Sequence, residues 1–152
     1  VLEKLAREGD PTAIAMPRMM EQKDKLQFSY SGLKTYMVNL RQRQQLSEQD
    51  VKNAAAAFQE EALGQLVRKL ETASQLRSVR CLLVAGGVAA NQRFRQMVKQ
   101  RLRLPAHFPQ LDYCSDNAAM IAALGYHHLA KAQDHDVFHR LDWDAFSRYQ
   151  FV

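Results

Sequence analysis

The sequence has few cysteines and no long apolar run. Only two of its 152 residues are cysteines, and Cys81 and Cys114 lie far apart, without the C-x-x-C spacing of a zinc site. This arrangement gives no disulfide framework and is typical of a reducing compartment, so we expect a cytoplasmic protein. No apolar run approaches the roughly 20 residues of a membrane-spanning helix, so we expect no association with a membrane.

The chain also lacks a recognisable start. Val1 begins neither a signal peptide nor an initiator sequence, so we expect that an upstream part of the protein is missing. The residues present have the composition of one globular domain, with 47% apolar and 24% charged residues. Lysine and arginine (21) outnumber aspartate and glutamate (16), and the net charge of +5 favours a polyanionic partner without identifying one.

Apolar periodicity predicts a single α/β unit, rich in helix with a short sheet, over residues 1–152. Ser31 is expected to cap the second helix, and Ser47 with Asp50 the third and longest. The aromatic tail at 135–152 is expected to pack against the rest of the domain. Helices are expected at 1–8, 32–40, 47–76, 91–101 and 115–132, and strands at 26–30 (half-buried), 79–85 (covered on both faces) and 106–108.

Two adjacent glycines, Gly86 and Gly87, end the predicted strand at 79–85 in the stretch LLVAGGVAANQRFR. Glycine tolerates unusual backbone angles and lets a ligand approach the backbone, and α/β sheets usually bind ligands at the carboxyl ends of their strands. The following helix offers unpaired N–H groups to an anion, and the Asn91 amide can both donate and accept a hydrogen bond. The same residues equally suit a tight turn in which Asn91 only caps the helix.

A second candidate site is the stretch YCSDNAAMIA at 113–122. Ser115 or Asp116 can cap the helix that follows, which is an ordinary structural role. Alternatively, a carboxylate held at the start of a helix can bind a divalent cation that bridges phosphate groups. One carboxylate does not hold a metal ion alone, so Asp116 would need further ligands from elsewhere.

Three stretches in this order, FSYSGLKT (28–35), LLVAGGVAANQRFR (82–95) and CSDNAAMIA (114–122), resemble the carboxyl-terminal half of the TsaD (YgjD) family. These are tRNA N6-adenosine threonylcarbamoyltransferases, related to the catalytic subunit of the KEOPS complex. The resemblance implies the ASKHA fold of actin, hexokinase and Hsp70-type ATPases, in which two α/β lobes close on a nucleotide. This chain would then be the C-terminal lobe of a longer two-lobe protein, with the N-terminal lobe absent.

The resemblance also implies roles for single residues. Gly86, Gly87 and Asn91 would contact the adenylate of ATP or of threonylcarbamoyl-AMP, and Asp116 would bind a divalent metal (iron, zinc or magnesium). The family's other metal ligands, two histidines in an H-x-x-x-H motif, lie on the amino-terminal side and are absent from this chain. The first stretch contains three residues to which the resemblance assigns no contact: Ser29, Ser31 and Lys34.

The activity implied is transfer of the threonylcarbamoyl group from threonylcarbamoyl-AMP to N6 of adenosine 37 in tRNAs that read codons beginning with A. The implied partners are tRNA and, in a bacterium, TsaB-like and TsaE-like proteins. We expect the isolated chain to be inactive, and homodimerisation through apolar surface left uncovered is one further expectation. Basic residues beside the glycine turn could meet the tRNA backbone or form an ordinary solvated face: Arg93, Arg95, Lys99, Arg101 and Arg103.

Two other functions remain as alternatives, and two pairs of histidines need an interpretation. A metalloprotease acting on glycoproteins is an older description of this family, but the sequence has no H-E-x-x-H motif. A non-catalytic nucleotide-binding or assembly lobe suits a chain without the amino-terminal half. His135 and His139 form an H-x-x-x-H pair downstream of Asp116, and we interpret this pair as part of a solvated turn. We interpret His127 and His128 as packing or surface residues.

Overall fold

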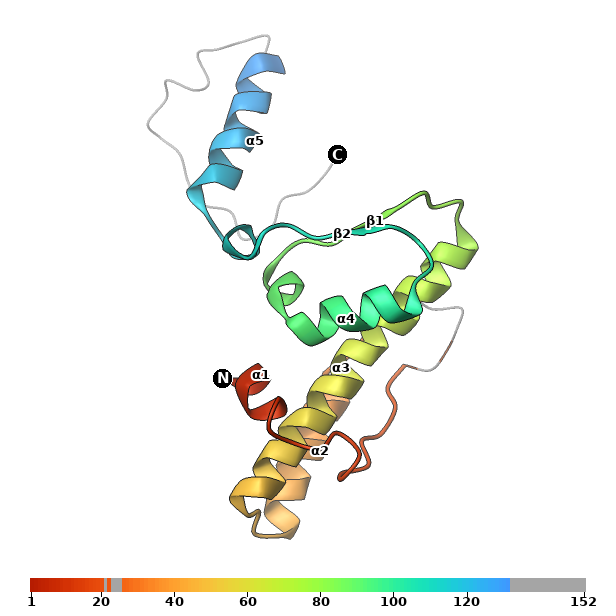
Figure 1. Ribbon diagram of the computed structural model, residues 1–152, viewed down its shortest axis with the longest axis vertical. Coiled ribbons are helices and arrows are strands. Elements are labelled where there is room, and N and C mark those ends of the chain that lie inside the picture. The colour runs from red at the N-terminus through yellow and green to blue at the C-terminus, as the bar shows by residue number, and fades with distance from the viewer. Residues whose placement is uncertain (21, 23–25, 132–152) are drawn as a thin grey trace. The chain divides into compact units, whose positions relative to one another are not determined.

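The computed structural model describes residues 1–20, 22 and 26–131 (Figure 1). The expected aromatic tail and the His135/His139 pair lie outside these residues. The chain divides into two compact units, residues 1–115 and 116–152, and each is described by itself. The first unit contains the helices α1 (Leu2–Ala6), α2 (Ser31–Arg43), α3 (Glu48–Leu76) and α4 (Gln92–Arg101), the strands β1 (Leu82–Leu83) and β2 (Ala106–His107), and the 3-10 turns η1 (Gly87–Ala90) and η2 (Leu111–Tyr113).

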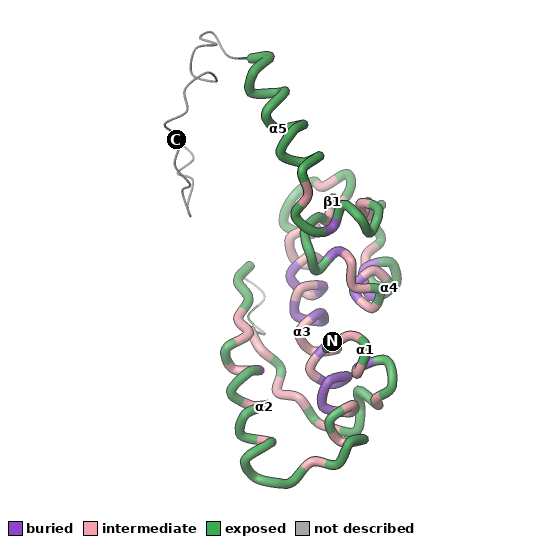
Figure 2. The backbone as a smooth tube through the Cα atoms, turned by 90° about the vertical axis from the view of Figure 1, so that its left-hand side faces the viewer, coloured by how far each residue is buried: buried purple, intermediate pink, exposed green. Residues whose placement is uncertain are grey.

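The long helix α3 organises the first unit, and its start confirms the predicted cap. The Ser47 hydroxyl accepts a hydrogen bond from the Asp50 N–H at 3.1 Å, and the Asp50 carboxylate accepts one from the Ser47 N–H at 3.0 Å. Two clusters of buried side chains form along α3, and Figure 2 shows buried residues concentrated on this helix. Alanines at 54–57 allow the short helix α1 to approach closely, whereas the larger Leu63 and Val67 pack against α4.

The two strands form a minimal parallel sheet in which Leu82 pairs with Ala106 and Leu83 with His107. This confirms the short strand expected at 106–108. The expectation of a strand over 79–85 covered on both faces was wrong, because regular pairing is limited to Leu82 and Leu83 and the side chain of Leu83 is 77% exposed. Leu82 and Val84 pack against the core, so only one face of this strand is covered by the described residues.

The half-buried strand expected at 26–30 is also absent from the structure. The Ser29 N–H donates to Gln65 Oε1 at 2.7 Å, and the Ser29 carbonyl accepts from Gln65 Nε2 at 3.1 Å. The buried amide of Gln65 therefore occupies both backbone groups that a neighbouring strand would use. Leu26 and Phe28 stay about half exposed, so the alternation of apolar and polar residues in this stretch does not mark a half-buried strand.

Two of the predicted caps were wrong. Tyr30 precedes α2 without a side-chain cap, and Ser31 is the first residue of that helix, with its hydroxyl 2.9 Å from that of Ser29. In the second unit, helix α5 (Ala118–Lys131) begins later than expected, and Asn117 Oδ1 accepts a hydrogen bond from the Met120 N–H at 3.0 Å. Asn117 therefore caps α5, rather than Ser115 or Asp116. No described helix is long and apolar enough to cross a membrane.

Candidate functional site

The glycine turn follows β1 directly and is open. Gly86 has φ +84° and ψ 175°, and its carbonyl accepts a hydrogen bond from the Ala89 N–H at 2.9 Å, which closes the turn η1. A Cβ atom placed on Gly86 or Gly87 would meet no other atom within 4 Å. The positive φ of Gly86 favours glycine there, but no neighbouring group forces Gly87 to be small, and the backbone of the turn is accessible to a ligand.

Asn91 has the structural role that the sequence left as an alternative. Its Oδ1 accepts a hydrogen bond from the Phe94 N–H at 2.9 Å and so caps α4, while its Nδ2 donates to Gln59 Oε1 at 3.0 Å. Gln59 is itself buried on α3. The amide of Asn91 is therefore held in one orientation, with one N–H and one oxygen lone pair left for a ligand.

Two of the arginines for which the sequence left open a tRNA contact or an ordinary solvated face instead bond to protein groups, and one of them, Arg95, holds this turn in place. Arg95 donates to the carbonyls of Ala89 at 2.6 Å and Pro109 at 2.8 Å, and its guanidinium lies 4.9 Å from the centre of the Phe108 ring. Arg93 forms a bidentate pair with Glu60, with both distances 2.8 Å, and these hydrogen bonds raise the pKa of Arg93. The sequence showed that these residues are basic but not which acceptors they meet.

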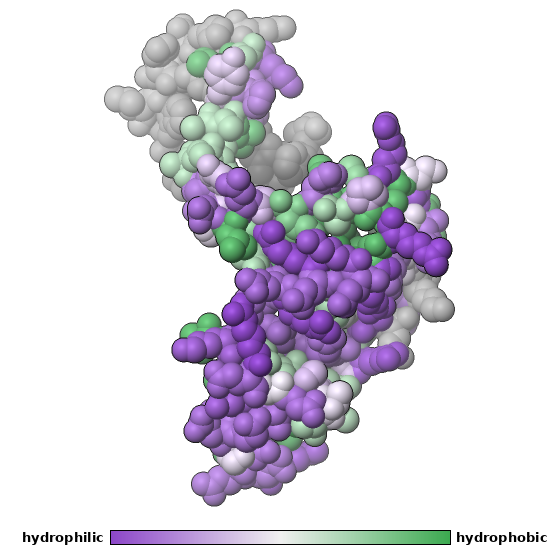
Figure 3. Space-filling model, in the orientation of Figure 1, coloured by the Kyte–Doolittle hydropathy of each residue, from purple (hydrophilic) through white to green (hydrophobic). Residues whose placement is uncertain are grey.

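An apolar cavity of about 570 Å³ adjoins the glycine turn. Ala85 and Val88, on either side of the two glycines, line it together with Phe28 and Tyr30 from the first of the three quoted stretches. The first two stretches, distant in sequence, therefore meet at one cavity. An apolar hollow beside exposed backbone groups has the character of a small-molecule site. Figure 3 shows a more hydrophobic surface over the two strands than over α4.

The remaining residues of the first stretch lie on or near α2. Ser29 is held by Gln65 through its backbone, Ser31 by the hydroxyl of Ser29, and Lys34 is exposed. These contacts orient the stretch so that Phe28 and Tyr30 reach the cavity. The structure therefore gives Ser29 and Ser31 a positioning role that the sequence did not assign.

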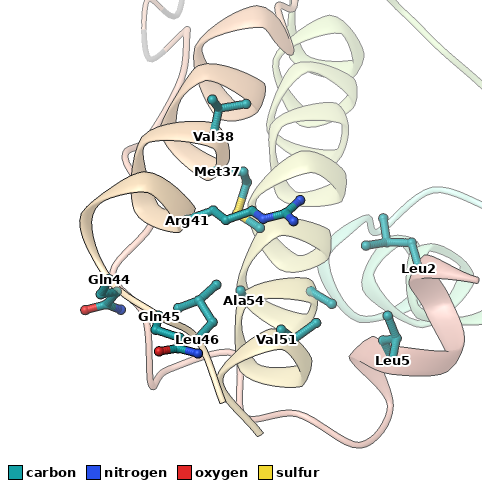
Figure 4. Close-up of a pocket in the computed structure, with 11 residues that line it drawn as sticks. Leu2, Leu5, Met37, Val38, Arg41, Gln44, Gln45, Leu46, Val51 and Ala54 are labelled. Carbon is teal, nitrogen blue, oxygen red and sulfur yellow. The ribbon is translucent and has the colours of Figure 1, made fainter. Parts of the chain in front are cut away.

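A second apolar hollow, of about 710 Å³, lies among α1, α2 and α3 (Figure 4). Leu2 and Leu5 of α1, Val38 of α2 and Val51 of α3 contribute to its walls, and Arg41 extends over it. None of the predicted site residues lines it. It is separate from the glycine turn and is not part of the candidate site.

Asp116 belongs to the second unit and is exposed. Among the described residues, no group of three or more His, Cys, Asp or Glu side chains could hold a metal ion. Asp116 can therefore contribute one ligand, and the described residues do not form a metal centre by themselves. His127 and His128, expected to be packing or surface residues, are exposed on α5.

Comparison with known proteins identifies the family. A family model described as TsaD, tRNA N6-adenosine threonylcarbamoyltransferase, matches residues 1–123. The chain belongs to the TsaD family. Membership implies an ASKHA-type fold, with which this helix-rich α/β structure and its short parallel sheet are consistent.

Relatives in several bacteria agree with this assignment. The tRNA N6-adenosine threonylcarbamoyltransferase of Treponema denticola is 42% identical over 137 residues, covering 86% of this chain and 40% of the relative. The protein of the same name from Moorella thermoacetica is 41% identical over 131 residues, covering 83% and 38%. The one from Wolbachia pipientis is 37% identical over 136 residues, covering 86% and 41%. The chain thus spans about two fifths of the length of these TsaD relatives and matches their carboxyl-terminal part.

Proposed function

We propose that this chain is the carboxyl-terminal, adenylate-binding part of an enzyme that transfers a threonylcarbamoyl group to N6 of adenosine 37 in tRNA. Membership of the TsaD family supports the reaction. The observation that carries the site is the open glycine turn, where neither Gly86 nor Gly87 has a neighbouring atom in the space of a Cβ. Bare backbone at the end of a parallel strand, beside an apolar cavity, suits a nucleotide.

The reaction is an acyl transfer from threonylcarbamoyl-AMP. The N6 amine of adenosine attacks the carbamoyl carbon, a C–N bond forms, and the bond from that carbon to the phosphate oxygen breaks. AMP leaves with the bonding electrons, and N6 loses a proton. No side chain of this chain has to act as a nucleophile, so its contribution is to bind and orient the adenylate.

The contacts around the turn describe how that orientation would be kept. Arg95 fixes η1 through the Ala89 carbonyl, and Asn91 fixes the start of α4 through the Phe94 N–H. Both side chains are therefore positioned before a ligand arrives, which lowers the entropic cost of binding. In this proposal Gly86 and Gly87 present backbone to the adenylate and Asn91 offers its remaining N–H.

A divalent metal is part of the proposal, with iron, zinc and magnesium as candidates. When bound, it would stabilise negative charge on phosphate and carbonyl oxygens. Asp116 is the described residue that would supply a ligand, and the other ligands would come from outside the described residues. Because the chain spans about two fifths of its relatives, we also propose that it is inactive alone and acts in the cytoplasm with tRNA and with TsaB-like and TsaE-like proteins.

The test is a transfer assay with the full-length protein, its partner proteins, threonylcarbamoyl-AMP and an unmodified tRNA. We expect threonylcarbamoyladenosine at position 37, and no product from residues 1–152 alone. A parallel assay with a glycoprotein substrate tests the older peptidase description. Cleavage of the glycoprotein without modification of the tRNA would refute the proposed function.

A further inference from the structure

Four of the eight residues that line a cavity of about 480 Å³ in the first unit are cationic. It lies where the loop after α1 meets α3 and the end of α4. Arg18 comes from the loop, Arg68 and Lys69 from α3, and Arg101 from α4, with Glu71 as the carboxylate among the lining residues. The residues that the sequence grouped as a basic helix contribute only Arg101, so folding assembles a different basic site from distant segments.

Arg68 and Arg101 each pair with a carboxylate of α3. Arg68 pairs with Glu61 at 2.5 and 3.3 Å, and Arg101 pairs with Glu71 at 2.7 and 3.1 Å. Each pair is neutral overall and holds its guanidinium in a fixed direction at the wall of the cavity. Neither of these two carboxylates forms an ion pair with Lys69.

Lys69 is the distinctive residue of this site. It is only 6% exposed, and its Nζ donates to the neutral carbonyl of Gln22 at 2.5 Å. Within the described part of the chain, no carboxylate forms an ion pair with it. An ammonium group has three N–H donors, and burying it without an opposite charge is unfavourable. An anion in the cavity would supply a negative charge and further acceptors for this ammonium group.

We propose that this cavity binds a phosphate group of the tRNA backbone. The inference rests on the proposed function, because it assigns a surface for the tRNA that the enzyme modifies. We argue for an RNA strand rather than a single small anion because the net charge of +5 favours a polyanionic partner. Lys99 and Arg103 flank Arg101 in the chain and are exposed, and Figure 3 shows a hydrophilic surface over α4. A polyanion can engage the cavity and these residues together.

The test compares Lys69→Met with Lys4→Met, which removes the same charge from an exposed position on α1. Binding of an unmodified tRNA transcript by the full-length protein is measured by fluorescence anisotropy at several salt concentrations. We expect Lys69→Met to raise the Kd about tenfold at low salt and to reduce the slope of log K against log salt by about one, as loss of one phosphate contact does. The Kd of Lys4→Met for tRNA should stay within about twofold of that of wild type.

Thermal melting separates this role from a purely structural one. If Lys69 binds an anion, Lys69→Met removes a buried charge, and the Tm of the variant should equal or exceed that of wild type. If Lys69 only ties the loop to α3, its Tm should fall and tRNA binding should not change, which would overturn the inference. Should Lys69→Met fail to fold, Arg18→Gln, at an exposed position, replaces it, with the same reduction in salt slope expected and an unchanged slope counting against the site.

The outcomes also distinguish this inference from the proposed function. A wild-type protein that modifies tRNA, with variants that keep the wild-type Kd and salt slope, would overturn the phosphate site alone. A wild-type protein that binds tRNA but forms no threonylcarbamoyladenosine would overturn the proposed function, and the variants would still decide the site. A wild-type protein that does not bind tRNA would overturn both.

Discussion

Gly86 and Gly87 are adjacent in sequence, but they differ in what their backbones require. Gly86 has φ +84°, a value that L side chains rarely adopt, whereas Gly87 does not have a positive φ. The sequence predicted the turn and its openness but not this difference, because two identical letters give no information about which residue carries the unusual angle. The structure therefore separates a glycine that the fold needs from one that only a ligand would need.

This difference makes Gly87→Val a specific probe of ligand binding. Gly86→Val should lower the free energy of unfolding by about 1–3 kcal/mol, because the new side chain would be strained at positive φ. Gly87→Val adds a side chain in open space, so its free energy of unfolding should stay within about 0.5 kcal/mol of wild type. Its Kd for ATP should nevertheless rise at least about tenfold if the adenylate lies against the backbone. Denaturant unfolding and ATP titration of the full-length variants give both quantities. ATP binding within about twofold of wild type in Gly87→Val would mean that Gly87 is not a contact.

Among the elements, the helices were predicted better than the strands. Helix α3 has a capping box and a long apolar stripe, both of which are local signals, and its observed bounds follow them. The stretch at 26–30 carries an equally clear alternation, but its backbone partner is a glutamine side chain 36 positions later in the chain. A local pattern does not show which distant group will satisfy a backbone, so this error could not be avoided from the sequence alone.

The capping box of α3 should make stability depend on pH. Hydrogen bonds from the side chain and backbone of Ser47 lower the pKa of Asp50 below its ordinary 3.8. A carboxylate with a lowered folded-state pKa stabilises the protein above the ordinary pKa, and this contribution is lost as the pH falls through the lowered value. Asp50→Asn should therefore be less stable than wild type at neutral pH, with the gap narrowing towards about pH 3. Denaturant unfolding at both pH values measures the gap. A gap of the same size at both would show that the charge of Asp50 is not responsible.

At the scale of the whole chain, the sequence located two candidate sites but could not relate them. The glycine turn lies in residues 1–115, and Asp116 is the first residue of the second unit. Within the first unit, the FSYSGLKT and LLVAGGVAAN stretches meet at one cavity, which no spacing in the sequence indicated. The relatives extend well beyond the matched region. In the proposed function, the other metal ligands would therefore come from residues outside those described.

Asp116→Ala in the full-length enzyme tests whether the second unit contributes to that site. Asp116 is exposed and lies outside the Asn117 cap of α5, so its loss should change the Tm by no more than about 2 °C. Transfer to tRNA should nevertheless fall by at least about a hundredfold if the carboxylate is a metal ligand, because loss of one ligand disrupts both metal affinity and charge stabilisation. Metal content of the purified protein, measured by mass spectrometry, should fall in parallel.

The matched control is Asp112→Ala, which changes an exposed aspartate in η2. This variant should keep both the metal content and the activity of wild type. If Asp116→Ala retained wild-type activity and metal content, Asp116 would not be a ligand.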